Sequence, residues 1–128
     1  LNLIDNYVGN FEISVFNKIT TTEMNFKANI NFNIMKIDIE NKSAQIQLVY
    51  NIEMKDKATL KDLGVIKLTM NAILNSDTKL DKDAFEKKLF NEGIYNLEAV
   101  CRAYIMTATA NAGMPVINIP SFKFEKKN

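Results

Sequence analysis

The chain has 128 residues, a length that fits one domain spanning residues 1–128. Hydrophobic residues make up 47% and charged residues 24%, which excludes an intrinsically disordered chain. A formal charge of +1 gives no strong attraction to nucleic acid or anionic lipid. No apolar run reaches the roughly 18 residues that a membrane helix needs, and no basic-then-apolar signal opens the chain. We therefore expect no nucleic-acid partner and no membrane association.

The cysteine and histidine content excludes several kinds of site. With no histidine and a single cysteine, Cys101, the chain cannot form a histidine-based triad, a Cys–His pair, a disulfide framework or a four-ligand zinc site. It also lacks a glycine-rich phosphate loop. We therefore predict no catalytic residue, no metal and no cofactor. The reducing cytoplasm is the expected location.

Alternation with period two predicts strands along the first half of the chain. A first, outer strand is indicated where Phe11, Ile13 and Val15 alternate with other residues. The clearest alternation runs over residues 26–34, and a shift of the apolar positions after it predicts a bulge near Met35. A turn is expected over 39–44, a returning strand over 44–54, a charged loop over 55–61 and a further strand over 66–74.

The last third of the chain has helical periodicity. Asp83 and Glu86 have the spacing of a capping box, so a short helix over 81–91 is expected, ending near Gly93. Apolar residues at three- and four-residue spacing predict a long amphipathic helix over 95–112. Gly113 is the expected left-handed cap of that helix. Residues 116–120 should be extended and the tail 123–128 solvated.

These elements predict an α+β fold: a four-stranded antiparallel sheet followed by a short and a long C-terminal helix packed on one face. One helix protects only part of such a sheet, so apolar surface remains for a second copy or another chain. Flexible methionines such as Met35 and Met70 suit adaptable apolar contacts, although core filling explains each one singly.

The remaining polar residues have structural explanations. Asp81, Asp83 and Glu86 stand at a helix start, where acidic side chains cap the backbone. Glu98 and Arg102 have the i,i+4 spacing of an ion pair. Cys101 lies on the apolar face of the long helix, where a thiol behaves as a small hydrophobic group.

The last third also carries a family resemblance. Three consecutive stretches are similar to the region of SecB-like chaperones where the long helix closes before an "L-x-L-x-P-x-x-F" segment. They are the run Asn96–Ile105, the turn Ala110–Pro115 and the segment Val116–Phe122. The order of strands and helices also resembles that family, and so does the opening stretch with Tyr7, Val8 and Phe11.

The resemblance implies a cytosolic, ATP-independent holdase that binds unfolded, apolar polypeptide segments in grooves between helix and sheet. It also implies a homotetramer, a dimer of dimers. The positions it assigns to client binding are Ala28, Ile30, Phe32, Ile66, Leu68 and Met70. Those assigned to the contact between copies are Leu97, Cys101, Tyr104 and Ile105.

The sequence departs from SecB itself in two places. Only residues 123–128, mostly basic, follow the Pro-x-x-Phe segment, where SecB continues into another helix and an acidic tail. The first predicted strand offers Glu12 as its acid, whereas SecB docks the SecA motor through acidic residues there. These departures put SecA binding, and with it a role in protein transport, in doubt.

Three other functions remain open at this stage. One is a dedicated chaperone for a single partner, as in toxin–antitoxin systems. The second is a phage-type adaptor without holdase activity. The third is a thioester enzyme of the hot-dog type, which the order of elements disfavours because the long helix of that fold follows its first strand.

Overall fold

The computed structural model describes residues 1–19, 23–114 and 117 of the chain. Four long strands form one antiparallel sheet: β1 (Asn2–Val15), β2 (Met24–Asp38), β3 (Ser43–Asp56) and β4 (Asp62–Asn75). Their order across the sheet is β1-β4-β3-β2, so the two strands that come first in the chain lie at opposite edges. The predicted outer position of the first strand is confirmed, and the strand is longer than the alternation indicated.

Two tight turns join the three later strands. Between β2 and β3, Lys42 adopts a positive φ of 54°, and the Asp38 carboxylate accepts hydrogen bonds from the backbone and the side chain of Asn41 at 3.2 and 2.7 Å. Between β3 and β4, the Asp56 carboxylate accepts from the backbone N–H groups of Ala58 and Thr59. Both are aspartate-stabilised turns, so side-chain chemistry fixes the hairpins locally.

The bulge predicted near Met35 is confirmed, because the β2–β3 register shifts between Ile34 and Lys36. β1 carries two further irregularities against β4, between Leu3 and Asp5 and between Val8 and Asn10. The extra residue at each bulge re-aims the side chains that follow it, which keeps the apolar side chains of a strand on one face.

The C-terminal helical region differs from the prediction of two separate helices. α1 (Lys82–Lys88), a π-helical turn η1 (Leu89–Gly93) and α2 (Ile94–Asn111) follow one another without a break. The predicted end near Gly93 is wrong, since Gly93 has helical dihedral angles of −60° and −44°. The glycine serves packing instead: a Cβ there would lie 3.1 Å from the Leu74 side chain.

The predicted capping box at Asp83 and Glu86 is also wrong. Asp81 caps the helix, because its carboxylate accepts from the backbone N–H of Ala84 at 2.7 Å. The predicted cap at the other end is confirmed. Gly113 has a φ of 76°, its N–H donates to the Ala110 carbonyl, and Met114 N–H donates to that of Thr109. This pair of bonds is a Schellman motif. The predictions for 116–120 and 123–128 lie outside the described residues, apart from Ile117, which is buried.

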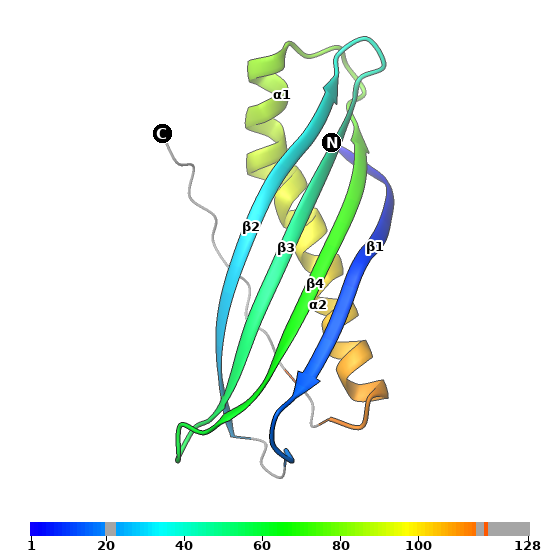
Figure 1. Ribbon diagram of the computed structural model, residues 1–128. Helices are drawn as coiled ribbons and strands as arrows, with labels where there is room; N and C mark the ends of the chain where they lie inside the picture. The colour runs from blue at the N-terminus through cyan, green and yellow to red at the C-terminus, as the bar shows by residue number, and fades with distance from the viewer. Residues whose placement is uncertain (20–22, 115–116, 118–128) are drawn as a thin grey trace.

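The core lies between one face of the sheet and α2, as predicted. α2 packs on β4, β3 and β1, and it crosses behind the sheet diagonally from the α1 end toward the lower end of β1 (Figure 1). The inward-facing side chains of the two central strands are almost completely buried. They are Ala44, Ile46, Leu48, Tyr50, Ile52 and Met54 on β3 and Leu63, Ile66, Leu68, Met70, Ala72 and Leu74 on β4.

The close approach of β1 to β4 gives a test of this sheet. A Cβ on Gly64 would overlap the Ser14 backbone carbonyl oxygen, so Gly64→Ala must push β1 away from β4. We expect a loss of about 1–3 kcal/mol in the free energy of unfolding, measured by urea titration.

Gly9→Ala is the matched control on the same strand pair. Its nearest neighbour is the movable Asn71 side-chain nitrogen, so the loss should stay below about 1 kcal/mol. Equal losses in the two variants would contradict the close approach at Gly64.

Candidate functional site

The side of the sheet near β2 offers the best candidate for a binding site. β2 alternates with period two, so Phe26, Ala28, Ile30 and Phe32 face the same side as the core, and each is half-buried. Their partners on β3 are Met54, Ile52, Tyr50 and Leu48, all 0% exposed. The β2 side chains are therefore less buried than their partners on β3, because α2 packs mainly on the other three strands. The result is an apolar row along one edge of the sheet, which we call the β2 row.

Apolar exposure continues beyond the β2 row. Ile34 is 38% exposed, and Met35, displaced by the bulge, is 57% exposed. Beside them is a hollow of about 340 Å³ between the end of β2 and the start of α1. Its lining consists of Ile34, Met35, Lys36, Ile37, Ile39, Lys82 and Glu86. The lining combines four apolar side chains with two lysines and one glutamate.

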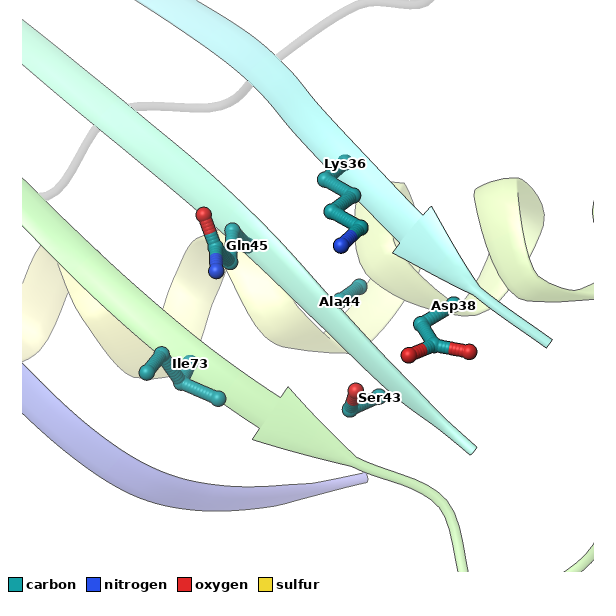
Figure 2. Close-up of a pocket in the computed structure, with 6 residues that line it drawn as sticks. All are labelled: Lys36, Asp38, Ser43, Ala44, Gln45 and Ile73. Atoms are coloured by element: carbon teal, nitrogen blue, oxygen red, sulfur yellow. The ribbon is translucent and has the colours of Figure 1, made fainter. Parts of the chain in front are cut away.

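A second hollow lies on the opposite face of the sheet, near the β2–β3 turn. Figure 2 shows Lys36 and Asp38 from β2, three residues from β3 and Ile73 from β4 around it. The volume is about 80 Å³, well below the several hundred Å³ of a typical small-molecule site. Lys36 and Asp38 carry opposite charges there, so this hollow selects neither an anion nor a cation.

The structure divides the six residues predicted to bind clients into two groups. Ala28, Ile30 and Phe32 lie together in the β2 row with surface to spare. Ile66, Leu68 and Met70 lie in the core at 0–1% exposure, so in this conformation they have no surface to offer a client. The alternation identified the inward face of each strand, but it carries no signal of which strands the helix covers. Ile34 belongs to the same alternation but is not among the residues predicted to bind clients, and the structure places it beside the hollow at the end of β2.

The residues predicted to join two copies also divide. Leu97, Cys101 and Ile105 are 0% exposed and belong to the buried core. Tyr104 is half-buried and meets Phe11 of β1 edge to face, with ring centroids 5.2 Å apart. The contact between copies stays a prediction. The exposed residues of α2 are a different set: Asn96, Ala99, Ala103, Met106, Thr107, Ala110 and Asn111.

Polar groups are also buried between α2 and β3. Glu98 is 1% exposed, and one of its carboxylate oxygens lies 3.0 Å from Nε of Arg102, which confirms the predicted i,i+4 ion pair. The Glu98 side chain is buried while that of Arg102 is 33% exposed, and removing one member of a buried pair costs about 3–5 kcal/mol. The Tyr50 hydroxyl is buried in the same region, beside the Cys101 thiol.

Cys101 confirms its predicted structural role. The thiol is buried, and burial raises its pKa from 9.0 to about 12, with the Glu98 carboxylate adding to the rise and Tyr50 opposing it. Burial likewise raises the pKa of the Tyr50 hydroxyl. A thiol with so high a pKa is protonated at neutral pH and is therefore a poor nucleophile.

Neither a metal-holding cluster nor a membrane-spanning helix is found in the described part of the chain. Within residues 1–19, 23–114 and 117, no three His, Cys, Asp or Glu side chains come together in a way that could hold a metal ion. In the same ranges no helix combines the length and apolarity required to cross a membrane. The binding surface that the described residues offer is the half-buried apolar row at a sheet edge.

Comparisons with known proteins agree with this architecture. A SecB-like chaperone from Mycobacterium tuberculosis, Rv1957, solved in complex with a ChAD peptide from the Rv1956 HigA1 antitoxin, has a TM-score of 0.74 with 9% identity. The match covers 98% of this chain and 92% of that one. The chain therefore has a SecB-like fold.

A protein of unknown function from Streptococcus agalactiae matches less well. Its TM-score is 0.45 with 15% identity, over 94% of this chain and 96% of that one. No family model and no curated protein matches the sequence.

The buried thiol predicts a pH dependence of stability. Between pH 9 and 12 the folded chain keeps the Cys101 proton while the unfolded chain loses it, so stability falls as pH rises through this window. At pH 10.5 the loss from this group should be about 2 kcal/mol.

Urea unfolding at pH 8 and 10.5 measures this loss. Cys101→Ala removes the group, so its stability should fall less over the same interval, whatever its stability at pH 8. Equal pH dependence in the two proteins would contradict a buried, protonated thiol.

Proposed function

We propose that this chain is an ATP-independent chaperone of the cytoplasm that binds unfolded or apolar polypeptide segments, and that it is not an enzyme. The observation that carries the proposal is the β2 row, an apolar surface left half-covered beside a fully buried core. Burying it against a client would contribute roughly 25 cal/mol per Å² of apolar surface removed from water.

The SecB-like fold supports this function, since the Mycobacterium tuberculosis protein that shares the fold was solved with a peptide bound. That peptide comes from an antitoxin, which equally supports a dedicated chaperone for one partner. The two forms of the proposal differ in breadth: a general holdase accepts many unfolded chains, whereas a dedicated chaperone accepts one. A role in SecA-dependent export would require docking of that motor, and β1 carries two acidic side chains, Asp5 and Glu12.

We also propose that the chain forms a homo-oligomer, with a dimer of dimers as the expected state. The exposed residues of α2 include no charged side chain, and Ala99, Ala103 and Ala110 would let a second helix approach closely. A surface of this kind on a soluble protein is typical of an interface.

Client binding is tested by native mass spectrometry with reduced, carboxymethylated lactalbumin as the unfolded chain. We expect the oligomer to bind this chain and to ignore native lactalbumin. Phe32→Ala should weaken binding about tenfold, because a large apolar contact of the β2 row is lost. Asn31→Ala, one residue along and on the opposite face, is the matched control and should bind as the parent does.

The outcomes separate the two forms of the proposal. An oligomer that ignores every unfolded chain points to one dedicated partner, to be captured by affinity purification from the source cell. A stable monomer with no affinity for unfolded chains and no such partner would contradict chaperone function.

Self-association is tested by a charge on the exposed side of α2. Ala103→Glu should dissociate copies that meet through this helix, as measured by sedimentation velocity, while the free energy of unfolding of the monomer changes little. Asn29→Glu, on the opposite face of the sheet, is the control and should leave the mass unchanged. An unchanged mass for Ala103→Glu would place the interface elsewhere.

A further inference from the structure

The backbone of β2 contributes a second element to the binding site. The N–H of Lys57 donates to the carbonyl of Glu23 at 3.1 Å, which makes these two residues a hydrogen-bonded pair in the β2–β3 register. Such pairs alternate along an antiparallel ladder. The odd-numbered residues from Asn25 to Asn33 therefore direct their backbone groups to β3, and the even-numbered residues direct theirs to the free edge.

The even-numbered residues are those of the β2 row. Each residue of the β2 row thus presents an apolar side chain toward the core side. Toward the edge it presents an N–H and a C=O that pair with no strand of the described residues. Both kinds of contact are available to one extended chain laid along β2. The order of strands places β2 at an edge of the sheet, with β3 as its partner in the described chain.

The two edges of the sheet differ in how far they can accept another strand. β1 is interrupted by two bulges, at Ile4 and at Gly9, which limit regular pairing to short pieces. β2 pairs regularly from Met24 to Ile34 and bulges only at Met35. Over that stretch β2 carries no proline and no charged side chain on its core-facing side, two devices by which proteins protect exposed edges.

The charge along this edge indicates what kind of chain would fit. From Met24 to Ile37, β2 carries Lys27 and Lys36 and no acidic residue. Its outward-facing side chains between Lys27 and Asn33 are otherwise asparagines. A segment that alternates apolar side chains with uncharged polar or acidic ones would match both faces.

We propose that β2 binds an extended polypeptide segment by antiparallel strand addition, with alternate apolar side chains of that segment packed against the β2 row. The inference rests on the proposed function and specifies its binding mode. Antiparallel addition continues the pattern of the sheet and gives the more stable ladder. In this arrangement the apolar residues of the bound segment direct their own N–H groups to β2.

Backbone methylation of a peptide tests this arrangement. The probe is the fluorophore-labelled, amidated peptide Thr-Leu-Gln-Val-Thr-Val-Gln-Leu-Thr, with affinity measured by fluorescence anisotropy. N-methylation of the two valines removes N–H groups that would face β2, and we expect affinity to fall by about tenfold or more. N-methylation of the two glutamines, whose N–H groups would face solvent, is the matched control and should retain affinity within about twofold.

Reduced, carboxymethylated lactalbumin is measured in parallel. Equal affinities for the two methylated peptides would overturn strand addition while leaving the proposed function standing. The reverse order of affinities would overturn the antiparallel orientation. If neither the peptides nor unfolded lactalbumin bind, the general-holdase form of the proposed function fails and this inference fails with it.

A change in the protein provides the second test. Ala28→Pro removes an edge-facing N–H without breaking a hydrogen bond to β3, so the sheet should fold, as thermal unfolding will verify. We expect about tenfold weaker peptide binding than for Ala28→Val, which keeps the N–H. Equal binding by the two folded variants would overturn strand addition. A change in oligomer mass for Ala28→Pro alone would show that a second copy occupies the edge instead.

Discussion

One helix is narrower than a sheet of four strands, and this difference in width determines which strands are covered. A helix with its side chains is about 10–12 Å across, while neighbouring strands lie about 4.8 Å apart. α2 can therefore seal the two central strands, and their inward side chains are buried almost completely. The edge strands receive partial cover. β1 gains some of it where Phe11 meets Tyr104 of the helix, and β2 keeps a half-exposed apolar row.

Much of the opposite face of the sheet is polar, although Val49, Val65 and Ile73 lie on it half-buried. Asn33 donates to Gln47 at 3.2 Å, and Gln47 donates to Asn71 at 3.1 Å, so three strands are linked by side-chain amides. These amides remain hydrated and satisfied without a second layer. Apolar contact with another chain is therefore directed to the helix side of the sheet and to its edges, which is where the β2 row lies.

Much of the fold could be predicted from the sequence because its signals are local. The alternation over 26–34, the bulge at Met35 and the helix cap at Gly113 each depend on a few neighbouring residues. The errors arose where tertiary packing decided. Gly93 was predicted to end a helix, yet contact with Leu74 makes a glycine useful inside one. The division of the predicted client site, with Ile30 at the surface and Leu68 in the core, depends on the path of α2, which no periodicity encodes.

The partial burial of the β2 row also bears on how a chaperone could release its client without ATP. Covering about 50 Å² of additional apolar surface at each of its residues would contribute about 1 kcal/mol per residue. Ordering the backbone of the bound segment costs about 1–2 kcal/mol per residue, so side-chain contacts alone would barely hold an extended chain. Backbone hydrogen bonds to the edge of β2 would add about 0.5–1.5 kcal/mol each. Because these gains and costs are similar in size, each residue adds little to the free energy of binding. Affinity then depends on the length of the exposed segment, and binding ends when the client folds and withdraws that segment.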